Sequence, residues 1–393
     1  MENPKIRFKG FTKDWEQRKL GDVFEQTSNL VNPKEDEIEL WSLTVEDGLT
    51  QKSDRYNREF LVKKDDNFKE VRPGDIVYNP MNMTLGAVGY NGMAKSVAVS
   101  GYYTTMVAKE NYDTYYINTW LKSPQAIRLY RTYATGSLIE KQRVQFPTLS
   151  IIPVTFPKYE EQTKIGSYFH SLDHLITLHQ RKCEQTKKLK KYMLQKMFPQ
   201  NGEKIPKIRF DGFTYDWEQR KWMNSVDIST EMVDPASGEY DDMPHIAPGN
   251  IESFTGRVLD NVRTVKEEQL ISGKFRFRPD DVVYGKINPQ LGKYFYASVD
   301  GLTSADAYVF KGKNGITQKF LFSLLQTSDF FKYSVSVSKR SGMPKINRDE
   351  LNAYAFLAPS EEEQDKIGNF LLELDHLITL HQRQHKLHLN MLL

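Results

Sequence analysis

Residues 160–181, EEQTKIGSYFHSLDHLITLHQR, and residues 362–383, EEQDKIGNFLLELDHLITLHQR, are two copies of one segment, 202 residues apart. They differ at six of 22 positions. A second pair has the same offset: residues 4–20, PKIRFKGFTKDWEQRKL, and residues 206–222, PKIRFDGFTYDWEQRKW, differ at three of 17 positions. Because an internal repeat reflects the architecture of the whole chain, these pairs predict two similar units.

The longer repeated segments have the pattern of long helices. Pro157 and Pro359 precede acidic clusters, which suit the positive end of a helix dipole. Apolar and polar residues then recur every seven positions, as in a coiled coil: Ile165, Leu172, His179, Thr186 and Met193. We expect helices over residues 160–198 and 361–393, the second a shorter copy, and we expect them to pair antiparallel.

Between the repeated segments lie two bodies, residues 21–156 and 223–358, whose sequences differ. One echo remains, RPGDIVY at 72–78 and RPDDVVY at 278–284. β-Branched and aromatic runs predict strands, and longer runs predict helices. The expected strands are residues 75–78, 96–100, 281–284 and 307–310, and the expected helices are residues 115–133 and 319–335. The repeated segments are nearly identical, whereas the two bodies differ in sequence. This contrast indicates that both halves dock to the same kind of partner and that each body binds its own target. The alternative is a recent duplication in which some segments diverged faster than others.

The predicted fold class is therefore α+β: two α/β domains joined by a pair of long antiparallel coiled-coil helices, with a pseudo-two-fold internal repeat. The expected domains are residues 1–156 with the lead-in 4–20, the central helix 157–200, residues 201–358 with the lead-in 206–222, and the distal helix 359–393. Antiparallel pairing would hold the two bodies tens of ångströms apart, since 39 helical residues span roughly 58 Å.

Composition limits the class of protein further. The chain has 393 residues, a net charge of +3 and 12% aromatic residues, which favours two or three globular domains over disorder. Cys183 is the single cysteine, so an internal disulfide and a cysteine-based zinc site are excluded. No secretory signal or membrane-spanning run is present in the sequence, and we expect a cytoplasmic protein.

Catalytic motifs are incomplete. Asn79-Pro80-Met81-Asn82 lacks the third and fourth residues of the adenine methyltransferase element, and no glycine-rich cofactor or phosphate loop occurs. A metal-dependent nuclease could begin at Pro279-Asp280, but the acid expected two residues before Lys286 is Tyr284. His381 and His385 are four residues apart and could share a metal. Polar contacts on a helix surface are the simpler interpretation of these histidines, so neither a catalytic residue nor a metal site is predicted.

Two sets of residues are candidates for binding DNA. The first set is a basic window near the end of each body, where Gly and Ser allow close approach to phosphate and Lys or Arg neutralise it. An ordinary solvated charged face is the alternative. In the first body the window comprises Arg128, Arg131, Thr135, Ser137, Lys141 and Arg143; in the second it comprises Lys339, Arg340, Ser341, Lys345 and Arg348.

The second set follows the Arg-Pro-x-Asp strand of each body. Asn and Gln can bind adenine, and Lys can bind guanine, through the edges exposed in the major groove. Ordinary loop polarity is the alternative. The candidates are Asn79, Asn82, Thr84, Tyr102, Tyr103 and Thr104 in the first body, and Lys286, Asn288, Gln290, Ser304 and Asp306 in the second.

The whole chain resembles the specificity subunit of a type I restriction–modification enzyme. The resemblance rests on the lead-in DWEQRKLGD at 14–22, its copy at 216–222, the helix entry Pro…Glu-Glu-Gln…Ile-Gly…Leu-Asp-His-Leu-Ile, and the duplication with variable bodies. It implies a non-catalytic subunit that binds double-stranded DNA. Each body would recognise one half of a bipartite target, and the helix pair would set the spacer.

The resemblance also implies partners. Two methyltransferase subunits, carrying S-adenosylmethionine, would bind the repeated regions, and up to two motor–nuclease subunits would use ATP and Mg²⁺. The implied methyltransferase interface comprises Trp15, Leu20, Leu172, His174, Leu175, Ile176, Trp217, Leu374, His376, Leu377 and Ile378. Two other functions stay open from the residues alone: a fused adenine methyltransferase or nuclease, and a helical scaffold whose bodies bind proteins.

Overall fold

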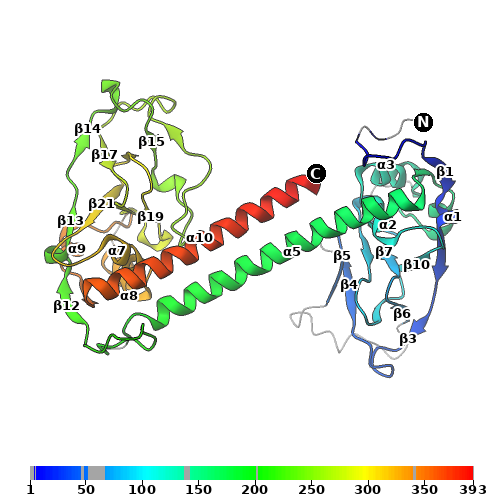
Figure 1. Ribbon diagram of the computed structural model, residues 1–393, viewed down its shortest axis with the longest axis horizontal. Coiled ribbons are helices and arrows are strands. Elements are labelled where there is room, and N and C mark those ends of the chain that lie inside the picture. The colour runs from blue at the N-terminus through cyan, green and yellow to red at the C-terminus, as the bar shows by residue number, and fades with distance from the viewer. Residues whose placement is uncertain are drawn as a thin grey trace. The chain divides into compact units, whose positions relative to one another are not determined.

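The computed structural model describes residues 4, 6–45, 48–51, 67–136, 142–200, 202–339 and 342–392. The chain divides into two compact units, Met1–Leu175 with Met391–Leu393, and Ile176–Asn390. The division falls between Leu175 and Ile176, within the long helix α5 (Tyr159–Lys196), which is continuous across it (Figure 1). The second long helix, α10 (Glu361–Leu392), closes the chain. Both long helices are therefore confirmed within two residues of their expected bounds.

The first body is built on a four-stranded antiparallel sheet. Its strand order is β2-β10-β7-β8, and a two-stranded sheet β1-β11 joins the lead-in to the strand before α5. Smaller sheets, β3-β6-β9 and β4-β5, complete the strands. The strands are β1 (Glu16–Lys19), β2 (Phe24–Thr27), β3 (Leu30–Val31), β4 (Trp41–Thr44), β5 (Gly48–Gln51), β6 (Phe68–Val71), β7 (Ile76–Tyr78), β8 (Val88–Tyr90), β9 (Val97–Ser100), β10 (Thr104–Ala108) and β11 (Pro153–Phe156). The helices are α1 (Leu20–Val23), α2 (Thr114–Leu121), α3 (Pro124–Tyr133), α4 (Phe146–Ser150) and the 3-10 turn η3 (Met83–Leu85).

The second body repeats this frame. Its main sheet has the order β13-β21-β18-β19, and β12-β22 takes the place of β1-β11. A larger sheet, β14-β17-β20-β15-β16, replaces the small sheets of the first body. The strands are β12 (Glu218–Lys221), β13 (Val226–Ile228), β14 (Met232–Val233), β15 (Pro244–His245), β16 (Arg263–Thr264), β17 (Lys274–Phe277), β18 (Val282–Gly285), β19 (Tyr294–Tyr296), β20 (Gly301–Thr303), β21 (Ala307–Gly312) and β22 (Ala355–Ala358). The helices are α6 (Trp222–Ser225), α7 (Gln318–Leu325), α8 (Ser328–Val337), α9 (Arg348–Asn352) and the 3-10 turns η5 (Pro235–Ser237), η6 (Pro248–Asn250) and η7 (Pro289–Leu291).

Each helix expected within a body is two helices instead of one. The hydroxyl of Ser123 accepts a hydrogen bond from the amide of Ala126, and Pro124 occupies the first turn of α3. Thr327 caps α8 in the same way, through the amide of Phe330. Because a cap satisfies free amides at a new helix start, the chain turns at these residues.

The Arg-Pro-x-Asp echo is a tight turn that leads into the central strand. The amide of Asp75 donates to the carbonyl of Arg72 at 3.0 Å, and the carboxylate of Asp75 accepts from the amide of Arg72 at 2.9 Å. Gly74 has a positive φ of 90°, as the third residue of a type II turn requires, and Asp280 takes φ 72° at the same place in the second body. This turn accounts for the surviving similarity between the two bodies.

An arginine of each lead-in holds the start of each long helix. The guanidinium of Arg7 donates two hydrogen bonds to Glu161, at 2.9 and 2.7 Å. Arg209 makes the same bidentate contact with Glu363, at 2.7 and 2.8 Å. Both glutamates are almost fully buried, at 2% and 1% exposure. Each lead-in is therefore joined to the first turn of a long helix by the same buried ion pair.

Two further contacts seat each long helix against its own body. The side chain of Gln162 accepts from the amide of Asp113 at the start of α2, and Gln364 accepts from the amide of Thr317 at the start of α7, both at 3.0 Å. One turn later the helices carry glycine. A Cβ on Gly166 would lie 2.6 Å from the amide nitrogen of Tyr116, and one on Gly368 would lie 2.8 Å from the carbonyl carbon of Lys319. Glycine at these positions allows the backbones to approach closely.

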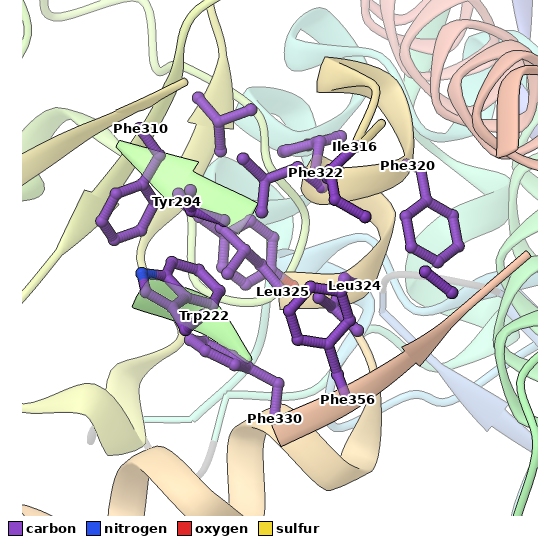
Figure 2. Packing of buried hydrophobic residues seen from close by; sticks show 14 of the residues in the cluster. Trp222, Tyr294, Phe310, Ile316, Phe320, Phe322, Leu324, Leu325, Phe330 and Phe356 are labelled. Carbon is purple, nitrogen blue, oxygen red and sulfur yellow. The ribbon is translucent and has the colours of Figure 1, made fainter. Parts of the chain in front are cut away.

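Aromatic residues form the core of the second body (Figure 2). Trp222 is fully buried and packs against Phe310, with ring centroids 5.0 Å apart, and against Phe330, at 5.7 Å. Helix α7 supplies Phe320, Leu321, Phe322, Leu324 and Leu325 to this core. Since Trp222 is the last residue of the lead-in repeat, the repeated frame and the variable body share one hydrophobic core.

The two long helices pack antiparallel within the second unit. The Nδ1 atoms of His179 and His381 lie 3.2 Å apart, and the sulfur of Cys183 lies 4.0 Å from the carbonyl oxygen of Ile378. Further along α5, the ammonium of Lys190 pairs with Asp375. The contacts run in opposite directions along the two helices, which confirms the expected antiparallel pair. Among the described residues, none of the helices combines the length and apolar character needed to span a bilayer.

Candidate nucleic-acid interface

In the second body, three separate segments meet at one edge of the main sheet. Strand β18 ends at Gly285 opposite Ala307, the first residue of β21. The amide of Lys286 donates to the carbonyl of Asp306 at 2.9 Å, which joins the loop after β18 to the turn before β21. The amide of Asn288 donates to the carbonyl of Pro344 at 2.8 Å, which joins the same loop to the basic window.

The first body makes the same arrangement from different residues. Thr104 begins β10 opposite Tyr78, the last residue of β7. The amide of Val144 donates to the carbonyl of Pro80 at 3.0 Å, and the Nε of Arg131 donates to the carbonyl of Thr84 at 3.3 Å. The two sets of DNA candidates, which are far apart in sequence, therefore converge in both bodies.

Most of these candidates have accessible side chains. The exposed ones are Asn82, Tyr102, Arg128, Arg131, Thr135 and Arg143 in the first body, and Gln290, Asp306, Lys339 and Lys345 in the second. The half-buried ones are Asn79, Thr84, Tyr103, Lys286, Asn288, Ser304 and Arg348. Four candidates lie outside the described residues: Ser137, Lys141, Arg340 and Ser341. The accessible set combines amides, hydroxyls and cations, which is the chemistry needed to contact both bases and phosphates.

The structure argues against one candidate, Thr104, and shows that a second, Arg348, also has contacts within the protein. Thr104 is only 6% exposed and lies within the sheet, so its hydroxyl is not available to DNA. Arg348 is engaged within the protein, because its guanidinium donates to the carbonyls of Ile228 at 3.4 Å and Ser229 at 3.1 Å. These contacts join the end of the basic window to the end of β13. Sequence patterns could not show this, since both partners are main-chain carbonyls distant in the chain.

Tyr308 also lies at this interface, although no sequence pattern marked it as a candidate. Its ring, 8% exposed, lies beneath the ammonium of Lys286 at 5.2 Å and near the guanidinium of Arg348 at 5.9 Å. Cations on an aromatic face are stabilised by the ring quadrupole. Burial lowers the pKa of Lys286, the charges of Lys345 and Arg348 lower it further, and Asp306 acts in the opposite direction. The only signal in the sequence was a strand pattern at 307–310, which says nothing about neighbours in space.

The expected methyltransferase interface is also corrected in part. Four of its residues are buried, and a buried side chain is not available to a partner: Leu20 at 0%, Leu172 at 4%, Trp217 at 1% and Leu374 at 5% exposure. His174 and His376 are exposed. The half-buried remainder comprises Trp15, Leu175, Ile176, Leu377 and Ile378. The heptad and lead-in patterns marked these buried residues because core packing produces the same periodicity as an interface.

Several histidines of the two long helices lie close together. In the part of the chain that the structure describes, no group of three or more His, Cys, Asp or Glu side chains could hold a metal ion. His179 instead meets the rings of His381 and His388, with centroids 5.4 Å away in each case.

The sequence of the chain matches a family of known proteins. The type I restriction modification DNA specificity domain matches the chain over residues 12–188 and 231–390. A type I restriction enzyme EcoDI specificity subunit from Escherichia coli is 27% identical over 241 residues, which cover 55% of this chain and 53% of that protein. The chain thus aligns with about half the length of that relative. The MjaVIII specificity subunit from Methanocaldococcus jannaschii is 23% identical and the alignment covers 84% of this chain and 80% of that protein.

A solved structure shows the same fold. The S subunit of a type I restriction-modification system from M. genitalium superposes with a TM-score of 0.65 at 13% sequence identity, covering 100% of this chain and 97% of that one. The family match extends over both bodies and most of both long helices. The chain therefore belongs to the type I restriction modification DNA specificity domain family and has the organisation of a type I specificity subunit.

Proposed function

We propose that this chain selects the DNA target of a type I restriction–modification complex by recognising a bipartite sequence, one half-site per body. The observation that carries the proposal is the convergence described above. In both bodies the loop after the central strand meets the basic window at the same sheet edge, on a frame of identical topology. The side chains at that edge differ between the bodies, as recognition of two different half-sites requires.

The proposal keeps the domain assignment 1–156, 157–200, 201–358 and 359–393. The antiparallel helix pair would set the spacer between the half-sites. A stiff helix changes length by about 5.4 Å per turn, whereas duplex DNA advances about 3.4 Å per base pair and rotates, so only certain spacers would satisfy both bodies.

Catalysis would belong to partner subunits. Two methyltransferase subunits would supply S-adenosylmethionine and act on flipped adenines, and up to two restriction subunits would supply ATP-dependent cleavage with Mg²⁺. Their docking surface on this chain would include the exposed His174 and His376, which occupy equivalent positions of the two repeated helices. The incomplete methyltransferase motif at residues 79–82 favours this division of labour over a fused enzyme.

Mapping methylated adenines in cells that make this chain with its methyltransferase tests the proposal. We expect one bipartite sequence with a fixed spacer. Replacing residues 223–358 with the corresponding body of a relative should change one half of that sequence only. Methylation by the purified chain alone would support a fused enzyme, and a change in both halves would contradict independent bodies.

A further inference from the structure

We propose that Lys286 determines part of the specificity of the second body by donating to the major-groove edge of a guanine. The proposal rests on the function proposed above and identifies a base that one half-site contains. Three observations support it: the surroundings of Lys286, the unused hydrogen-bonding capacity of its ammonium, and the residues that replace it in the first body.

Lys286 is held in place by the surface beneath it. Its ammonium lies 5.2 Å from the ring centroid of Tyr308, whose own hydroxyl donates to the carbonyl of Ile346 at 3.3 Å. Two main-chain hydrogen bonds fix the backbone of Lys286. Its amide donates to the carbonyl of Asp306, and its carbonyl accepts from the amide of Ile346. A side chain that is already oriented loses less entropy when it binds a ligand.

The ammonium has unused hydrogen-bonding capacity. Arg348, which approaches the same ring, is engaged by two main-chain carbonyls. Lys286 has neither a hydrogen bond nor an ion pair from its ammonium to any residue that the structure describes. Burial is the main cause that lowers the pKa of the half-buried Lys286. The nearby charge of Asp306 raises this pKa, whereas the charges of Lys345 and Arg348 lower it. An incoming group with two acceptors would satisfy the ammonium and relieve this unfavourable environment.

This cluster is specific to the second body. The carbonyl of Pro80 accepts from Val144 as that of Lys286 accepts from Ile346, so Pro80 occupies the equivalent position. Thr104 faces Tyr78 across the sheet as Tyr308 faces Tyr284. Arg348 begins α9, and α4 begins at Phe146, 202 residues earlier. The first body thus has proline, threonine and phenylalanine where the second has Lys286, Tyr308 and Arg348.

The contrast favours a base over a phosphate. Phosphates are the same in every half-site, so their contacts carry no sequence information and need not differ between the bodies. The cluster around Lys286 is present in the second body and replaced in the first, although both bodies share the same main sheet. Such a difference is suited to a contact that depends on the DNA sequence. Guanine presents two acceptors in the major groove, O6 and N7, and lysine is one of its preferred partners.

The test uses the complex of this chain with its methyltransferase and duplexes that carry the mapped target. Lys286→Met removes the charge but keeps an apolar stem on the ring of Tyr308. At one position of the half-site that the second body recognises, the wild type should bind a G·C pair more tightly than any other base pair. The expected difference in affinity is about 5- to 150-fold, the range for one good base contact. In Lys286→Met this preference should collapse at that position alone.

Replacing that guanine with 7-deazaguanine, which lacks the N7 acceptor, sharpens the test. Binding should weaken for the wild type and stay unchanged for Lys286→Met. Lys266→Ala, a change at an exposed lysine that pairs with Asp241 outside the candidate interface, should leave the base preference intact. Thermal melting of each variant establishes that it is folded.

Several results would overturn the inference. A uniform loss of affinity across all sequences, with a salt slope lowered by about one, would make Lys286 a phosphate contact. An unchanged base preference, or a second half-site without guanine, would also refute it. If the wild-type complex shows no bipartite preference at all, the proposed function itself fails.

Discussion

His179 and His381 occupy equivalent positions of the two repeated helices, 202 residues apart, and their Nδ1 atoms meet at 3.2 Å. The antiparallel pair therefore brings a residue into contact with its own repeat copy. Other basic side chains surround His179 as well: Lys182 of α5, and His385 and His388 of α10. Partial burial, followed by these neighbours, lowers the pKa of His179 below 6.5.

The helix pair should therefore weaken in acid. Because the folded pKa of His179 is depressed, the unfolded chain binds more protons below about pH 6.5, and stability is lost as the pH falls from there through the folded pKa. We expect the melting temperature to decline between about pH 6.5 and 5, and to decline less steeply in His179→Gln. Differential scanning calorimetry across this range measures both. An identical slope in the variant would show that His179 is not the group responsible.

The buried ion pair between the second lead-in and α10 should contribute strongly to stability. Arg209→Met would leave Glu363, 1% exposed, without its partner, and removing one member of a buried pair costs about 3 kcal/mol or more. Urea unfolding measures the destabilisation. Lys187→Met, which breaks the exposed pair with Glu184, is the control and should cost under about 1 kcal/mol. Equal effects of the two changes would contradict the assigned role of the lead-in.

Gly368 should resist replacement even though alanine favours helices. A Cβ there would lie 2.5 Å from the Cβ of Lys319 and 2.8 Å from its carbonyl carbon, so α10 would be pushed away from α7. We expect Gly368→Ala to destabilise the protein by about 1–3 kcal/mol. Gly249→Ala, where a Cβ would meet no atom within 4 Å, should change stability by less than about 0.5 kcal/mol. Stabilisation by Gly368→Ala would refute the close approach.

The basic window of the second body should act on DNA without regard to sequence. Replacing Lys339 and Arg340 with alanine should weaken binding at all sequences and reduce the salt slope by about 0.9 for each phosphate that is no longer neutralised. Fluorescence anisotropy at several salt concentrations measures the slope. Lys266→Ala, at an exposed lysine paired with Asp241 elsewhere in the body, should leave it unchanged. An unchanged slope in the double variant would remove the window from the interface.

The internal repeat is the reason why the two long helices and the two similar units could be predicted from the sequence alone. The offset of 202 residues and the heptad spacing predicted α5, α10 and the duplicated frame, since helical periodicity and capping are local properties. The strands around residues 76–78 and 282–285 also followed from local composition. The same local patterns failed to separate core from surface at Leu20 and Trp217, because both kinds of position favour large apolar residues.

The tertiary structure decided which residues share a site. The loop beginning at Lys286, the turn ending at Asp306 and the segment around Lys345 are brought together by hydrogen bonds between main-chain atoms, which any residue could make. No pattern in the sequence marks such contacts. The places of Tyr308 and Thr104 in the sheet put Tyr308 beside Lys286 in the candidate interface and bury the side chain of Thr104. The sequence by itself determined two repeated frames with long helices, and only folding in three dimensions determined the surface that each frame presents.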